Sequence, residues 1–213
     1  MSHIIEYVEQ GSAEWKAVRL GKVTASRVAD VTAKTKTGYG ASRANYQAEL
    51  ICERLTGVPV EGFTNAAMVW GTTTEPLARE AYEFMHGVEV AQVGFIHHAT
   101  ISMSGASPDG LVGKSGLIEI KCPNSAGHIE TLLSEKIPAK YETQMAWQMA
   151  CTGAAFCDYV SFDPRLPADM QLFVKRLDRD DALIADLEKE VRAFLAEVDA
   201  KIAALTEKFA RAA

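Results

Sequence analysis

The stretch that decides the fold runs from Ser107 to Lys121 and reads SPDGLVGKSGLIEIK. Its second part, Gly116–Lys121, alternates in the manner of a β-strand, so Glu119 and Lys121 share one face while the isoleucines between them point into the core. Its first part is a Pro-Asp-Gly turn that begins a short strand returning toward the second. Such a hairpin places the carboxylate of Asp109 beside that of Glu119.

Two carboxylates that converge with a lysine are unfavourable unless a cation lies between them. Carboxylate oxygens suit Mg²⁺ or Mn²⁺. Lys121 can then position or activate a water, or stabilise negative charge that develops on a phosphate. A hairpin followed by a strand with a surface ion pair explains the same spacing, so the short motif alone leaves both interpretations open.

The flanking sequence predicts the elements around this hairpin. Helices are predicted at 12–20, 26–33, 42–56, 66–86, 126–135, 139–151 and 179–210, and strands at 88–96, 101–103, 111–112, 155–162 and 172–177. Ser12, Ser26 and Ser42 are the expected N-caps, Pro138 the expected first helical residue, and 34–40 a loop. This order indicates a mixed α/β (α+β-type) domain, with a central mixed β-sheet flanked by helices.

Length and composition narrow the class of protein. The chain has 213 residues, of which 48% are hydrophobic and 23% charged, which fits a single domain over 1–213 whose C-terminal helix, 179–211, packs on the core. We expect neither a membrane span nor a secretory signal, because long uncharged apolar windows are absent. Four cysteines without a CxxC pair exclude a disulfide scaffold and favour the reducing cytoplasm.

The net charge of -6 argues, on its own, against a nucleic-acid partner, because phosphate binding requires local positive charge. The average hides a basic run, however. Residues 16–43 hold seven basic side chains against one acidic side chain. The run is either a solvated face or an anion-binding surface, and the acidic middle of the chain suits a cation site.

Asp109, Glu119 and Lys121 reproduce the PD-(D/E)XK nuclease motif, and the chain as a whole resembles the phage lambda-type 5′→3′ exonucleases of the YqaJ-like viral recombinase group. A PD-(D/E)XK restriction-endonuclease-like fold is therefore expected. Six ordered blocks carry the resemblance: Trp15–Ser26 (WxxxRLGKVTAS), Trp70–Glu75 (WGxxxE), Ser107–Leu111 (SPDGL), Leu117–Pro123 (LIEIKCP), Tyr141–Gln148 (YxxQxxxQ) and Phe162–Arg165 (FDPR).

The resemblance implies a metal site. Asp109 and Glu119 would ligate the metal together with the backbone carbonyl of Ile120, and Glu75 would complete the acidic cluster from the long helix. Lys121 would act on the attacking water. Two Mg²⁺ ions per active site fit this chemistry, and Mn²⁺ can substitute.

The resemblance also implies a pocket for the 5′-phosphate of DNA, lined by Arg19, Ser26, Ser107 and Gln144. The physical chemistry agrees, since a serine at a helix start adds its hydroxyl to free backbone N–H groups, and an arginine grips phosphate with two bonds. A solvated arginine, a plain helix cap and a polar position on an interface helix are the simpler alternatives.

Further DNA contacts are expected from four side chains: Lys34, Lys36, Arg43 and Met68. The three basic residues would compensate for Ala66 and Ala67, which stand where some family members carry a basic residue. Met68 is either a core residue or an apolar wedge that parts the terminal base pair.

The expected function is a Mg²⁺-dependent exonuclease that degrades one strand of linear double-stranded DNA from its phosphorylated 5′ end. The 3′ overhang would serve homologous recombination by strand annealing. The resemblance implies a ring-shaped homotrimer, a single-strand annealing recombinase as partner, and the cytoplasm of a bacterial or phage-infected cell. The alternatives are a non-processive PD-(D/E)XK endonuclease, a catalytically inactive DNA-end binder, and a scaffold assembled through the C-terminal helix.

Overall fold

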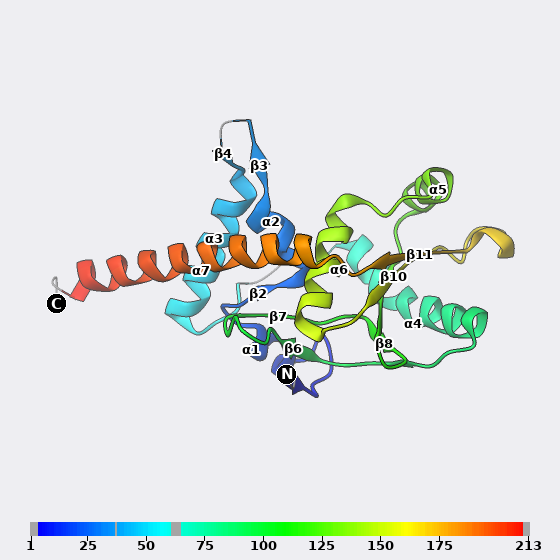
Figure 1. Cartoon of the computed structure of the whole chain (residues 1–213), viewed down its shortest axis with the longest axis horizontal. Coiled ribbons are helices and arrows are strands. Elements are labelled where there is room, and N and C mark those ends of the chain that lie inside the picture. Colours follow the sequence, from blue (N-terminus) through cyan, green and yellow to red (C-terminus); the bar gives the residue numbers. More distant parts are fainter. Residues whose placement is uncertain (1–3, 37, 61–64, 211–213) are drawn as a thin grey trace.

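The computed structural model describes residues 4–36, 38–60 and 65–210 (Figure 1). In this part of the chain, helices surround a five-stranded and a four-stranded β-sheet, and a separate two-stranded sheet is also present. The elements are, in chain order, β1 (Ile5–Glu6), α1 (Ala13–Arg19), β2 (Val23–Thr24), η1 (Ala25–Arg27), α2 (Val28–Thr32), β3 (Lys34–Thr35), β4 (Gly38–Tyr39), α3 (Ala41–Thr56), α4 (Ala66–His86), β5 (Val90–Ala91), β6 (Phe95–His97), β7 (Ser104–Ala106), β8 (Gly110–Val112), β9 (Gly116–Lys121), α5 (Ser125–Ser134), α6 (Ala139–Thr152), β10 (Phe156–Phe162), η2 (Ala168–Met170), β11 (Leu172–Asp178) and α7 (Asp181–Ala210).

The predicted α/β class, with mixed β-sheet flanked by helices, is confirmed, and most of the strands are divided between two sheets. One sheet has the strand order β11-β10-β9-β8-β5 and the other the order β1-β6-β7-β2. Both are mixed, since β9 and β10 run parallel, as do β2 and β7, whereas the other pairs are antiparallel. The five-stranded sheet carries Gly116–Lys121 near its middle.

The second sheet arises because the predicted strand 88–96 is two strands. Val90–Ala91 pairs with β8, whereas Phe95–His97 pairs with β7 and β1 in the other sheet. Between them, a Cβ added at Gly94 would lie 2.3 Å from the carbonyl oxygen of Val8. Only glycine permits that close backbone approach, so the chain changes sheets there.

Two other short elements differ from the prediction. The strand expected at 101–103 lies instead at Ser104–Ala106, and the expected loop 34–40 contains the two-stranded hairpin β3–β4. The first difference follows from pairing with β2, far away in the sequence, which local alternation does not encode. The hairpin is local, with Lys34 opposite Tyr39 and Thr35 opposite Gly38, but its residues are typical of a loop.

The helix starts were predicted with mixed success. Ser12 caps α1 as expected, since its hydroxyl accepts from the N–H of Trp15 at 3.1 Å. Ser26 lies inside η1, and the N-cap of α3 is Gly40 rather than Ser42. Pro138 is itself an N-cap, one position before its expected place. None of the described helices combines the length and apolarity needed to cross a bilayer.

The five-stranded sheet is covered on both faces by helices. Ile118 and Ile120 of β9 pack with Ala78 and Tyr82 of α4, so these isoleucines are buried as predicted. On the opposite face, Leu117 packs with residues of α6. The alternate residues of β9 therefore turn Glu119 toward α6.

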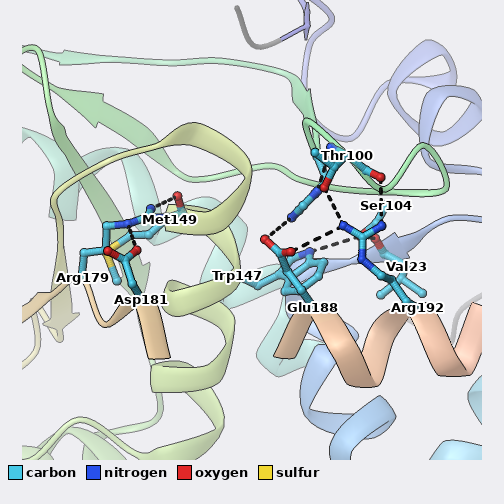
Figure 2. A network of polar contacts seen from close by, with 10 residues as sticks. Val23, Thr100, Ser104, Trp147, Met149, Arg179, Asp181, Glu188 and Arg192 are labelled. Carbon is cyan, nitrogen blue, oxygen red and sulfur yellow. Dashed lines mark hydrogen bonds and ion pairs between the residues drawn. The ribbon is translucent and has the colours of Figure 1, made fainter. Parts of the chain in front are cut away.

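Polar contacts join the residues leading into α7 to α6, and α7 itself to the loop between β6 and β7 (Figure 2). Arg192 donates to the carbonyl and hydroxyl oxygens of Thr100 at 3.0 and 2.6 Å. Arg179 donates to the carbonyl of Met149 at 2.6 Å. Trp147 of α6 in turn donates to the hydroxyl of Ser104 in β7 at 3.2 Å. These contacts fix α6 in place, and α6 carries two of the side chains at the site described next.

Candidate active site

Asp109 and Glu119 are brought together by the hairpin of β8 and β9. Gly110 pairs with Ile118 in antiparallel register, so the residue before Gly110 lies opposite the residue after Ile118. The Asp109 carboxylate accepts the backbone N–H of Ile120 at 2.6 Å, which fixes it beside β9. The predicted convergence of these two carboxylates is therefore confirmed.

Glu119 is completely buried and its two oxygens are held separately. Oε1 accepts from the amide of Gln144 at 2.7 Å, and Oε2 accepts from the amide of Gln148 at 2.6 Å. Lys121 forms an ion pair with the same carboxylate. Burial lowers the pKa of Lys121, but the charges of Glu119 and Asp109 outweigh it and raise that pKa overall. Lys121 is therefore a cation at the site and acts as a donor.

Glu75 joins this cluster from α4. It forms an ion pair with Arg79 one helical turn later, and its pKa is raised by burial even though Arg79 and Lys121 oppose the shift. Burial also raises the pKa of Asp109 well above its ordinary value, and the nearby charge of Glu119 adds to the effect. Burial thus disfavours the ionised forms of Glu75 and Asp109, and a cation bound beside them would stabilise those forms.

These three side chains offer carboxylate oxygens in a partly buried site. Oxygen ligands of this kind are the ones that a hard divalent cation such as Mg²⁺ prefers. In the described part of the chain, no three His, Cys, Asp or Glu side chains are arranged as a ready ligand set. The hydrogen bonds explain this, since the three carboxylates are turned toward Arg79, the N–H of Ile120 and the two glutamine amides.

The predicted phosphate residues Arg19 and Ser26 line one hollow of about 700 Å³. Ser107 is linked to the wall of this hollow, because its hydroxyl accepts the indole N–H of Trp15 at 2.9 Å. Gln144, which was grouped with them by resemblance, instead contacts Glu119. Two of the four predicted phosphate residues, Arg19 and Ser107, therefore contact one tryptophan. Ser26 lines the same hollow as that tryptophan, and Gln144 lies at the carboxylates.

A second hollow, of about 810 Å³, is lined by Glu75, Asp109 and Arg79. Trp15 and Met68 border both hollows. The side of Met68 facing them is accessible, since the residue is 54% exposed. The alternative that Met68 is a core residue is therefore wrong.

The basic run 16–43 is divided between two locations. Its first half contributes Lys16, Lys22 and Arg27 to the hollow that contains Arg19, although Arg27 is also paired with Asp30 and Glu49. The first half is therefore the part placed to meet an anion.

The second half of the run contacts α7. Lys34 pairs with Glu190 at 2.9 Å. Arg43 is 3% exposed, donates to the carbonyl of Val31 and pairs with Glu197 at 2.7 Å. This burial argues against the predicted DNA contact of Arg43, because its guanidinium serves the packing of α7. Lys36 is exposed.

Three side chains at the site were assigned no role from the sequence: Trp15, Arg79 and Gln148. Each lies four residues from a predicted site residue on the same helix, namely Arg19, Glu75 and Gln144. Residues four apart share a helix face. That spacing is the signal that could have identified them.

The chain is similar to a known protein family and to several solved structures. The chain is similar over its residues 14–155 to the YqaJ-like viral recombinase domain. It is 58% identical to an alkaline exonuclease (LHK-Exo) from Laribacter hongkongensis, whose crystal structure superposes with a TM-score of 0.89 over 95% of this chain and 100% of that chain. The structure of the same enzyme in complex with dAMP superposes with a TM-score of 0.90, at the same sequence identity and coverage.

A phage-related exonuclease from Haemophilus somnus 129PT shares the fold, with a TM-score of 0.70 at 16% identity over 86% of this chain and 96% of that chain. No curated protein is significantly similar. The fold is consistent with the expected PD-(D/E)XK-like nuclease fold. Since the similarity to the family covers most of the sequence, the chain belongs to the family of YqaJ-like viral recombinase domains.

Proposed function

We propose that the protein is a Mg²⁺-dependent 5′→3′ exonuclease, which degrades one strand of linear double-stranded DNA from its phosphorylated 5′ end and leaves a 3′ overhang. The observation that carries this proposal is the convergence of Asp109, Glu119 and Lys121. Asp109 lines a hollow that shares Trp15 and Met68 with the hollow containing Arg19. The 58% identity to an alkaline exonuclease, which has been crystallised with dAMP, supports it.

Each active site would hold two Mg²⁺ ions. Their ligands would be Asp109, Glu119, Glu75 and the backbone carbonyl of Ile120. Mn²⁺ could replace Mg²⁺ at these positions. When bound, these ions would supply Lewis-acid chemistry that lowers the pKa of water and neutralises charge on the leaving oxygen. Lys121, kept protonated by its acidic neighbours, donates toward the attacking water and the phosphate oxygens.

The polarity of digestion follows from where a terminal phosphate would bind. Arg19 and Ser26 line the hollow on one side of Trp15 and Met68, and Asp109 and Glu75 line the hollow on the other side. A 5′-phosphate held at Arg19 would place the first internucleotide bond toward the carboxylates, so a mononucleotide is released. Met68, exposed between the hollows, is placed to part the terminal base pair.

The family resemblance supports the wider setting of the proposal. The enzyme would act as a ring-shaped homotrimer around DNA, with a single-strand annealing recombinase as its partner in homologous recombination, in the cytoplasm of a bacterial or phage-infected cell. All four cysteines are free, as is usual in a reducing compartment. Light scattering on the purified protein tests the trimer directly, and a monomer in solution would remove the ring from the proposal.

The decisive experiment is digestion of a 5′-phosphorylated linear duplex with Mg²⁺, followed by chromatography of the released nucleotides. The wild type should release mononucleotides, and Lys121→Ala should be slower by about a thousandfold. Chelation of Mg²⁺ by EDTA should stop the wild type, and Mn²⁺ should restore it.

The same assay separates the alternatives. A closed circular duplex should resist the wild type, and its cleavage would favour the endonuclease instead. Absence of nucleotide release from linear duplex, with DNA ends still bound, would favour the inactive end binder. Equal activity of Lys121→Ala and wild type would remove Lys121 from the mechanism.

A further inference from the structure

Trp15 contacts two of the predicted phosphate residues at once, from opposite parts of its indole ring. The guanidinium carbon of Arg19, one turn later on α1, lies 3.6 Å from the centre of the ring. The indole N–H donates to the hydroxyl of Ser107 at 2.9 Å, although the two residues are distant in sequence. Ser12 fixes the start of α1 through the backbone N–H of Trp15 itself.

The stacking has a consequence for Arg19. Among the described residues, no carboxylate, carbonyl or hydroxyl accepts a hydrogen bond from its guanidinium, and burial lowers the pKa of Arg19 to about 10. The indole covers one flat face of the guanidinium, whereas its N–H donors lie in its plane. The donors of a partly desolvated cation are thus left for an anion that comes from outside the protein.

The hydrogen bond has a consequence for Ser107. A hydroxyl has one proton to donate, and here its oxygen already accepts the indole N–H. The proton must therefore point away from Trp15, and no described residue accepts it. Ser107 stands two residues before Asp109, so this free donor is close in the chain to one of the three carboxylates.

We propose that Trp15 is the positioning residue of the 5′-phosphate pocket, holding Arg19 by its ring face and Ser107 by its N–H so that both donate to one terminal phosphate. This assignment rests on the proposed function, since it deepens the phosphate-binding role of that site. Trp15 itself need not touch the phosphate. Its removal should weaken recognition of the phosphate and leave the hydrolytic residues unchanged.

Two variants separate the two contacts. Trp15→Phe keeps an aromatic ring on which Arg19 can stack but removes the indole N–H. Only the hydrogen bond that orients the Ser107 hydroxyl is therefore lost. Trp15→Leu removes the stacking as well. The measurement is the ratio of kcat/KM for 5′-phosphorylated over 5′-hydroxyl linear duplex with Mg²⁺, which should fall about tenfold in the first variant and about a hundredfold in the second.

A double-mutant cycle tests whether the N–H acts through Ser107. Ser107→Ala should lower the same ratio about tenfold, and Trp15→Phe combined with Ser107→Ala should lower it no further. Independent, multiplicative losses would overturn the coupling. Phe156→Leu is the matched control, because it removes the ring on which Arg176 stacks at 3.5 Å, on a strand end remote from the pocket, and it should leave the ratio unchanged.

Binding measured without hydrolysis distinguishes failure of this inference from failure of the proposed function. Calorimetry should show that the wild type binds dAMP more tightly than deoxyadenosine, and that Trp15→Leu loses this preference. If the wild type prefers neither dAMP over deoxyadenosine nor 5′-phosphorylated over 5′-hydroxyl ends, the proposed function is overturned. If the wild type shows both preferences and both Trp15 variants keep them in full, only the role of Trp15 is overturned.

Discussion

Gln148 and Glu119 are joined by a hydrogen bond of 2.6 Å between two side chains that are both completely buried. Gln144, one turn earlier on α6, holds the other oxygen of the same carboxylate at 2.7 Å. One amide donor on each oxygen fixes the plane of the carboxylate. Glu119 is therefore oriented by α6 before any substrate arrives.

Removal of one of these donors should slow hydrolysis. Gln148→Leu keeps the approximate size of the side chain but leaves Oε2 of Glu119 without its partner, and we expect kcat to fall about tenfold. Thr143→Ala, on the exposed side of the same helix, is the control and should not change kcat. Unchanged activity of Gln148→Leu with a normal unfolding temperature would show that Gln144 and Lys121 suffice to hold Glu119.

Arg19→Ala should slow digestion of 5′-phosphorylated duplex selectively. The loss should be about tenfold or more, since a charged hydrogen bond to phosphate is removed, whereas the 5′-hydroxyl duplex serves as the internal control. Arg19→Lys should restore only part of the preference, because an ammonium lacks the planar pair of donors. Equal slowing of both substrates would remove Arg19 from the phosphate pocket.

Arg43→Ala should lower stability without weakening DNA binding, whereas Lys36→Ala should weaken DNA binding without lowering stability. Arg43 is buried against α7, so its loss should lower the free energy of unfolding by about 2 kcal/mol, because Glu197 and the carbonyl of Val31 lose their partner. Exposed Lys36 should leave stability within about 0.5 kcal/mol. DNA binding measured against salt should weaken for Lys36→Ala and not for Arg43→Ala.

The expected result for Lys36→Ala is a smaller salt dependence of binding, with about one counterion fewer released. If Arg43→Ala also weakened DNA binding while its unfolding free energy stayed at the wild-type value, the structural role assigned to Arg43 would be contradicted.

Acid should destabilise the wild type through Asp163. This buried carboxyl accepts three hydrogen bonds from Arg165, two from the guanidinium and one from the backbone N–H. The guanidinium bonds are the main reason that its pKa is lowered to about 2, below its value in the unfolded chain. A lowered folded-state pKa adds stability above the unfolded pKa, and this stability is lost as the pH falls toward 2. Unfolding temperatures measured from pH 5 to pH 2 should show it.

In Arg165→Ala the pKa of Asp163 rises toward its ordinary value. The variant should be less stable than the wild type at pH 5, and the difference between the two proteins should shrink as the pH falls. A difference that stayed constant over this range would mean that Arg165 contributes to stability by packing on Trp70 rather than through the carboxyl.

The hairpin of β8 and β9 could be predicted because its signals are local. A Pro-Asp-Gly turn and a strict alternation fix which residues face each other, so Asp109 beside Glu119 follows from the sequence alone. Helix α4 could also be predicted from the sequence, and its observed bounds are Ala66 and His86, as expected. The change of sheets at Gly94 could not be predicted, because it depends on the backbone of Val8, far away in the sequence.

The candidate site could be predicted only in part, because some of its features depend on tertiary packing. Residue type and motif identified Glu75, Asp109, Glu119 and Lys121, but the fate of a charge depends on what packs against it. Arg43 belongs to the same basic run as Arg19, and only the position of α7 separates a buried ion pair from an open anion-binding group. Amphipathic periodicity indicates that a helix packs, without indicating which side chains it neutralises.

The spacing of the three helical pairs limits which insertions and deletions the gene can tolerate. Trp15 and Arg19, Glu75 and Arg79, and Gln144 and Gln148 each depend on one full helical turn. A single codon inserted between the members of a pair would rotate the second member by about 100° around the helix axis. Sequences that keep this activity should therefore vary in length between these helices and not within the turns that carry the pairs.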